Sequence, residues 1–151
     1  MSVRTILHCC VTVYDMEEAI GFFRDLLGFK VVSDGMFEPD ELGPLLDMSE
    51  PDCRTVCVRC PDESEIELME FRRPQGELRV ARRFEDAGIA VLTLIVDDVE
   101  ETVGTLADNG YPARSPVVRF EGPERDLWAF HCYGPSGLPL TIGEWRPHAE
   151  A

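Results

Sequence analysis

Residues 6–23 read ILHCCVTVYDMEEAIGFF, and residues 90–106 read AVLTLIVDDVEETVGTL. At a constant offset of 83 residues, Asp15 lies over Asp98, and a glutamate follows three residues after each aspartate. The apolar, β-branched run before each aspartate is typical of a strand. An aspartate with a glutamate at the third position after it is a capping box, which predicts a helix start. A strand-to-helix unit therefore occurs twice, and only the first copy carries a histidine, His8, where the second has Val91.

The residues around the two copies extend the repeat. We expect strands at 5–13 and 90–96, and a first helix at about 16–27 that ends at Gly28. Later, IELMEF (66–71) aligns with LTIGEW (140–145) at an offset of 74 residues, and a proline-containing hairpin, VRCPDESE or CYGPSGLP, precedes each. Each half is thus predicted to be a βαβββ unit, the first at about 5–75 and the second at about 88–147.

The predicted fold class is α+β. Three consecutive strands joined by hairpins make a mostly antiparallel sheet with the helix on one face. Two such curved sheets would form a trough, and the length of 151 residues favours a single domain over residues 1–151. Segments 36–53 and 113–126 are rich in proline, glycine and acidic residues, so we expect them to be loops.

Composition restricts the partners. The formal net charge of −15 repels nucleic acid and anionic membrane surfaces, and it favours a cationic ligand. The first apolar run has no signal-peptide features, and no run is long enough to span a bilayer, so a cytoplasmic location is expected. The six cysteines are expected to be reduced and mostly structural.

The stretch HCCVTVYDMEEAIGFFRDLLGFKVV and the later YGPSGLPLTI resemble the vicinal oxygen chelate superfamily, which includes glyoxalases, extradiol dioxygenases and bleomycin-binding proteins. The resemblance covers roughly residues 5–147. It implies a small-molecule protein whose fold serves lyases, epimerases, oxygenases and non-catalytic binders. In the metal-dependent members, it implies ligands from the first and last strands of each unit.

Carried onto this chain, those ligand positions are His8, Glu67, Val91 and Thr141. His8 and Glu67 suit a first-row divalent ion such as zinc, nickel, manganese or iron. Valine has no donor and threonine is a weak ligand, so the metal site is incomplete, and a protein without metal is the alternative. His131 is a candidate third site residue because its place in WAFHCYG resembles a cavity-facing position in fosfomycin-resistance relatives.

The leading functional hypothesis is an isomerase, epimerase or lyase that moves a proton next to a carbonyl, with Glu67, His8 and His131 as catalytic residues. Glu67 and His8 can also form a proton-transfer pair without a metal. The alternatives are a non-catalytic protein that sequesters a small organic molecule and a metal-free cyclase. A homodimer is expected, because a symmetric pairing is the commonest way to bury exposed apolar area.

Three other motifs have structural interpretations. Cys57 and Cys60 have zinc-knuckle spacing, but residues three apart on a strand face opposite sides. Glu70 and Glu144 occupy matching places, which favours a structural role. The arginines of residues 71–88 could form a clamp for an anionic ligand, but we expect them to be solvated. They are Arg72, Arg73, Arg79, Arg82 and Arg83.

Overall fold

The computed structural model describes residues 3–77 and 88–148. The chain divides into two compact units, Met1–Leu78 and Arg79–Ala151, and each contains one four-stranded sheet. The α+β class with two βαβββ repeats is therefore confirmed. The single domain and the trough stay predictions. Within the described residues, the helices are too short or too polar to cross a membrane.

The first unit forms a mixed sheet with the strand order β1-β4-β3-β2. The first strand pairs with the last in parallel, and the other pairs are antiparallel. Its elements in chain order are β1 (Cys9–Thr12), α1 (Met16–Ile20), a π-helical turn η1 (Gly21–Leu26), β2 (Lys30–Met36), α2 (Pro39–Leu46), β3 (Asp52–Arg59) and β4 (Glu65–Arg73).

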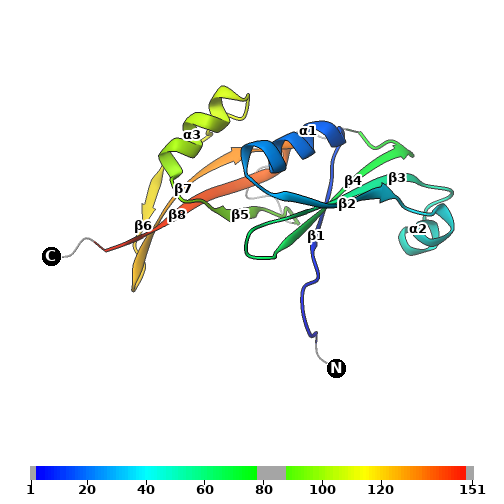
Figure 1. Cartoon of the computed structure of the whole chain (residues 1–151), viewed down its shortest axis with the longest axis horizontal. Helices are drawn as coiled ribbons and strands as arrows, with labels where there is room; N and C mark the ends of the chain where they lie inside the picture. The colour runs from blue at the N-terminus through cyan, green and yellow to red at the C-terminus, as the bar shows by residue number, and fades with distance from the viewer. Residues whose placement is uncertain (1–2, 78–87, 149–151) are drawn as a thin grey trace. The chain divides into compact units, whose positions relative to one another are not determined.

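Helix α1 and its π-helical extension cover one face of this sheet (Figure 1). The predicted cap is confirmed, because the Asp15 carboxylate accepts a hydrogen bond of 3.0 Å from the Glu18 backbone N–H. Phe22 and Phe23 are fully buried and meet edge to face. The buried strand residues on the face that α1 covers are Val11, Val56, Val58, Ile66 and Leu68.

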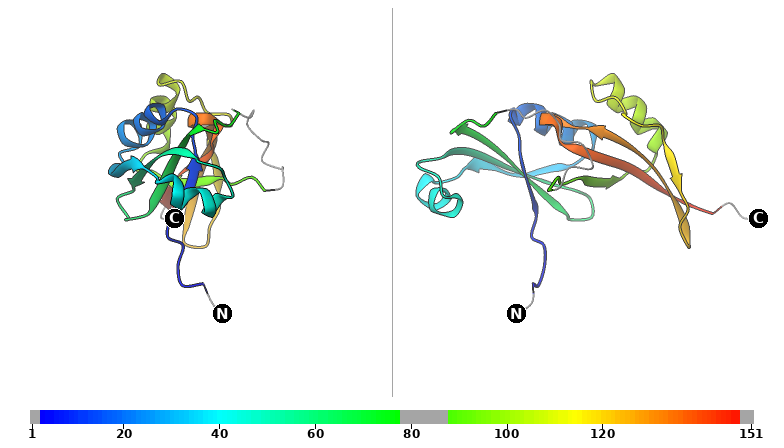
Figure 2. Two further views of the ribbon diagram at one scale, coloured as in Figure 1. Left: turned by 90° about the vertical axis from the view of Figure 1, so that its right-hand side faces the viewer. Right: turned by 180° about the vertical axis from the view of Figure 1, so that it is seen from behind.

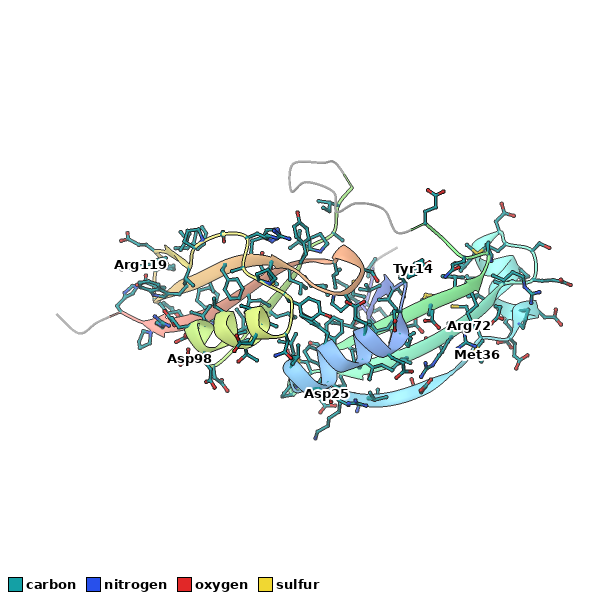
Figure 3. The ribbon with its side chains drawn as sticks, turned by 90° about the horizontal axis from the view of Figure 1, so that it is seen from above. Tyr14, Asp25, Met36, Arg72, Asp98 and Arg119 are labelled. Atoms are coloured by element: carbon teal, nitrogen blue, oxygen red, sulfur yellow. The ribbon has the colours of Figure 1, made fainter. Side chains whose placement is uncertain are left out.

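The expectation of a loop at 36–53 is wrong, because α2 lies within it. Leu42 of α2 is buried against Cys53 and Met69 of the sheet, so tertiary packing stabilises a segment with poor helix propensity. This contact puts α2 on the face opposite α1, near one end of the strands (Figure 2). Met36 and Arg72, which lie at the ends of β2 and β4, mark that end in Figure 3.

The first strand is shorter than predicted. Residues 5–8 lie outside it, and β1 spans Cys9–Thr12. The ladder with β4 starts at the Cys9–Ile66 pair, and β4 itself begins at Glu65 just after the hairpin turn, so only Glu65 remains in β4 ahead of the first paired residue. The helical segment, Met16–Leu26 in total, agrees with the expected 16–27.

The second unit repeats the same topology with the order β5-β8-β7-β6. Asp98 caps its helix by accepting a hydrogen bond of 2.8 Å from the Glu101 backbone N–H, as predicted. Its elements are β5 (Leu92–Ile95), α3 (Val99–Asp108), β6 (Val118–Phe120), β7 (Arg125–Tyr133), a 3-10 turn η2 (Pro135–Gly137) and β8 (Pro139–Pro147). Figure 1 shows α3 on one face of this sheet.

The expectation of a loop at 113–126 is also wrong, because β6 lies inside it and β7 starts at Arg125. Every residue of β6 is exposed, and the strand has only 3 residues, too few for an alternation of apolar and polar residues to identify it. It is identified by its antiparallel pairing with β7 alone.

The two hairpins confirm the second offset. In the first unit, the Cys60 N–H donates to the Ser64 carbonyl at 2.8 Å. The same bond joins Gly134 to Leu138 in the second unit, also at 2.8 Å and 74 residues later. The repeat read from the sequence is therefore also a repeat of backbone geometry at this hairpin.

Candidate functional site

Glu67 is the third residue of β4 and lies on the face opposite α1. Its neighbours Ile66 and Leu68 are 6% and 0% exposed and belong to the core under α1. Because side chains alternate along a strand, Glu67 points to the other face. Its side chain retains only 12% exposure. This orientation is the one predicted from the sequence.

Three side chains converge on the Glu67 carboxylate. The Thr55 hydroxyl donates to Oε1 at 3.0 Å. The Cys10 thiol donates to Oε2 at 3.0 Å, and His8 Nε2 lies 3.3 Å from the same oxygen. The structure thus brings the predicted pair His8 and Glu67 together and adds Cys10 and Thr55, which the sequence analysis did not include in the site.

The sheet register explains the convergence. Cys10 is the direct partner of Glu67 in the parallel β1–β4 ladder, and Cys57 is its partner in the antiparallel β3–β4 ladder. Thr55 lies two residues from Cys57 on β3, a spacing that keeps both side chains on the same face of the strand. His8 directly precedes β1, two residues before Cys10, and its contact with Glu67 shows that it reaches the same face. The signal for Cys10 was present in the sequence, since His8 and Cys10 have this spacing on one predicted strand.

The electrostatics of the site keep the Cys10 thiol protonated. Desolvation of the sulfur, followed by the hydrogen bond and charge of Glu67, raises the pKa of Cys10 from 9.0 to about 12. At neutral pH, the thiol is a neutral donor that helps fix the Glu67 carboxylate. A cation bound beside the sulfur would offset the negative charge of Glu67 and so favour the thiolate form of Cys10.

The donor atoms of His8, Cys10 and Glu67 fit one divalent ion. One ligand atom from each lies within 4.8 Å of the other two. Bonds of about 2.0 to 2.3 Å in a tetrahedron separate neighbouring ligand atoms by roughly 3.4 to 3.6 Å. The 3.3 Å and 3.0 Å contacts need only a small outward shift to reach that spacing.

His131, the third predicted site residue, belongs to β7 of the second unit. Its Nδ1 lies 2.8 Å from the Leu140 carbonyl oxygen. Its ring meets the Tyr133 ring edge to face, with the two ring centroids 4.8 Å apart. Thr141 is its ladder partner, and Thr93 lies beyond Thr141. The row Thr93, Thr141, His131 therefore repeats the row Cys10, Glu67, Cys57 with weaker ligands. The catalytic role of His131 stays a prediction.

Val91, the second-unit counterpart of His8, precedes β5 and is partly buried. Together with Thr141 it leaves the second unit without the carboxylate, thiol and imidazole that meet in the first unit. In the described residues of this row, His131 is the one side chain that could ligate a metal strongly.

Glu70 and Glu144 hold the starts of the two helices. The Met16 backbone N–H donates to Glu70 at 2.9 Å, and the Val99 N–H donates to Glu144 at 3.0 Å. Each carboxylate therefore ties the last strand of its unit to the first turn of the helix, where a negative charge also suits the helix dipole. These contacts agree with the structural role expected for both residues.

A second acidic group forms around Glu144 with Asp98 and Glu100. The guanidinium of Arg146 pairs with Glu100 and with Glu144, so an internal cation already neutralises this group. Among the predicted linker arginines, Arg72 pairs with Glu70 at 3.4 Å. Arg79, Arg82 and Arg83 lie outside the described residues.

The family model for the Glyoxalase/Bleomycin resistance protein/Dioxygenase superfamily matches residues 5–141. The chain belongs to this superfamily. No curated protein sequence matches the chain. The resemblance that the opening strand, the capped helix and the late hairpin carry is thereby confirmed.

Several solved structures similar to this chain have the same fold. A glyoxalase family protein from Bacillus cereus is 21% identical, with 96% of each chain covered and a TM-score of 0.83. One from Enterococcus faecalis is 19% identical over 93% of this chain and 98% of that one, with a TM-score of 0.63. An antibiotic-binding protein from Streptomyces sp. CB03234 is 17% identical over 97% and 99%, with a TM-score of 0.59.

Proposed function

We propose that this superfamily member is a small-molecule enzyme of the isomerase, epimerase or lyase type that moves a proton next to a carbonyl group. The observation that carries the proposal is the convergence of His8, Cys10 and Thr55 on the Glu67 carboxylate. A carboxylate held by donors on both oxygens, on a sheet face that its own helix α1 does not cover, has the position that a general base requires.

The two oxygens of Glu67 have different surroundings, and we assign them different roles. Oε2 faces His8 and Cys10, whereas Oε1 faces the Thr55 hydroxyl. Oε1 accepts the proton from the carbon next to the carbonyl, and Thr55 keeps this oxygen in place. In the metal-free protein, the His8 Nε2–H turns from Glu67 Oε2 to the substrate oxygen and donates a hydrogen bond to it as charge develops there.

A divalent ion, when bound, would polarise the carbonyl oxygen of the substrate. His8 and Glu67 are the residues that would hold it. The proton transfer is assigned to the Glu67 carboxylate in either case.

Exchange of carbon-bound hydrogen tests the proposal. The protein is incubated in deuterated water with a panel of aromatic, acyl-thioester and cationic carbonyl compounds, and proton NMR follows the signal next to the carbonyl. We expect the wild type to exchange at least one compound and Glu67→Gln to exchange it roughly 100-fold to 10,000-fold more slowly. Equal rates in the two proteins would contradict the role of Glu67.

Glu65→Gln is the matched control. Glu65 lies on the same strand and the same face as Glu67, but Arg59 pairs with it at 2.6 Å. Its replacement should leave the exchange rate within about twofold of the wild type. A loss as large as that of Glu67→Gln would mean that the strand, and not the carboxylate, was responsible.

The second candidate function is non-catalytic binding of a small organic molecule. The second unit favours it, because Phe120, Leu127 and Trp145 form a row across its sheet on the same face as His131. Phe120 and Trp145 are 56% and 39% exposed, so this row offers apolar surface to a ligand. A compound that raises the melting temperature but shows no hydrogen exchange would support binding over proton-transfer catalysis. Recovery of the compound unchanged would also argue against a metal-free cyclase.

A further inference from the structure

Cys10 differs from the buried cysteines of this protein. Cys53 and Cys132 are 0% exposed and fill the cores of their units. Cys10 is an exposed residue on β1, and its thiol contacts the Glu67 carboxylate on the face away from α1. Core packing therefore does not account for a cysteine at this position.

We propose that Cys10 is the third protein ligand of a divalent metal ion, together with His8 and Glu67, and that its sulfur makes the site selective for zinc-like ions. The inference rests on the ion site of the proposed function. The one ligand cluster of the first unit's described residues comprises these three donors. The thiol proton leaves to solvent as the sulfur–metal bond forms.

The donor set determines which ions fit. One imidazole nitrogen, one sulfur and one carboxylate oxygen suit Zn²⁺, Co²⁺ and Ni²⁺, whereas Mg²⁺ and Mn²⁺ prefer oxygen ligands. Three protein ligands also leave the fourth tetrahedral position open, as in catalytic zinc sites. The site is thus complete within the first βαβββ unit and does not require the absent ligands at Val91 and Thr141.

Cobalt spectroscopy tests the sulfur directly. Chelator-treated full-length protein is titrated with Co²⁺ alone, and the near-ultraviolet absorption is recorded. A sulfur-to-cobalt charge-transfer band should rise to one equivalent per chain. Addition of Zn²⁺ should remove the band, and a tenfold excess of Mg²⁺ should not. These spectra depend on ligation and need no substrate.

Two variants identify the sulfur. Cys10→Ser should lose the charge-transfer band and bind Zn²⁺ roughly 100-fold more weakly or worse, since even loss of an outer hydrogen-bond partner costs 10-fold to 100-fold. Cys57→Ser is the matched control, because Cys57 is the partner of Glu67 on the opposite neighbouring strand and lies outside the ligand cluster. This variant should keep both the band and the affinity.

X-ray absorption on the zinc-loaded wild type makes the test independent of variant folding, since ligation by Cys10 requires a sulfur neighbour at about 2.3 Å. Metal binding without a sulfur neighbour, or a band that survives in folded Cys10→Ser, would overturn ligation by Cys10 and leave the ion site of His8 and Glu67 intact. A wild type that binds neither Co²⁺ nor Zn²⁺ would overturn the inference as well, and the Glu67 exchange experiment would then decide the metal-free proposal on its own.

Discussion

The Cys10 thiol donates a hydrogen bond to Glu67 Oε2 at 3.0 Å across neighbouring parallel strands, between residues that are 57 positions apart in the chain. This contact joins the two residues on which the proposed metal ligation and proton transfer depend. Because desolvation, followed by the hydrogen bond and charge of Glu67, raises the pKa of Cys10, the rate at which the thiol is alkylated also depends on the carboxylate beside it.

In metal-free protein, Cys10 should be alkylated slowly. With its pKa raised from 9.0 to about 12, little thiolate is present at pH 8. After allowance for the greater nucleophilicity of a high-pKa thiolate, iodoacetamide should modify it roughly 30-fold to 100-fold more slowly than an unstructured cysteine peptide. Glu67→Gln should speed the reaction, because it removes the charge but not the desolvation. Peptide mass spectrometry checks both rates, and a slower reaction in the variant would be a contradiction.

Glu144 should make the second unit sensitive to acid. The hydrogen bonds from Arg146 and the Val99 N–H lower the pKa of Glu144 from 4.5 to about 2. A carboxyl with a depressed folded pKa stabilises the fold above pH 4.5, and this contribution is lost as the pH falls toward 2. Glu144→Gln should therefore lower the urea midpoint at pH 7 and flatten its decline between pH 4.5 and 2. Glu124→Gln, an exposed control, should retain the slope of the wild type.

Leu68 should be among the most costly core positions to truncate. Its side chain is 0% exposed. It follows Glu67 on β4 and points to the opposite face of the sheet, toward α1. Leu68→Ala should lower the free energy of unfolding by about 2 to 5 kcal/mol. Leu45→Ala, at a position that is 77% exposed, should change it by less than about 0.5 kcal/mol. Chemical denaturation followed by circular dichroism measures both, and similar costs would show that the core assignment is wrong.

A homodimer remains the expected assembly. Residues 3–8 extend away from the first sheet (Figure 1), and Val3, Ile6 and Leu7 on this segment are 89%, 86% and 76% exposed. A second copy would bury this apolar area. Sedimentation at tens of micromolar should give twice the 17.0 kDa of one chain. Ile6→Ser should shift the distribution toward the monomer, and a wild type that sediments at 17.0 kDa would refute the dimer.

The repeat was predictable because its signals are local. Asp15 and Asp98 cap their helices within three residues, and these bonds need only the aspartate and the first turn of the helix. The strand alternation around Glu67 was predictable for the same reason. The hairpin turns at matching offsets then made the two βαβββ units, and with them the α+β fold class, predictable.

The missed elements depend on contacts that are distant in the chain. Helix α2 contains Gly43 and Pro44, which are typical of loops, and it forms because Leu42 packs on Cys53 and Met69. A Cβ at position 43 would lie 2.9 Å from the Met48 carbonyl oxygen, so the glycine serves the close return of the chain. The partnership of Cys10 with Glu67 likewise required the β1–β4 register, which no local pattern specifies.

The pairing of first strand with last strand has a consequence for synthesis on the ribosome. The bond between Met16 and Glu70 spans 54 residues, and the one between Val99 and Glu144 spans 45 residues. Neither sheet can close before its own final strand has emerged, and contacts of such long range form slowly. Because amino-terminal segments emerge first, the first unit can close while the second is still being translated. A nascent chain halted before β4 would expose β1 without its parallel neighbour and α1 without the carboxylate at its start.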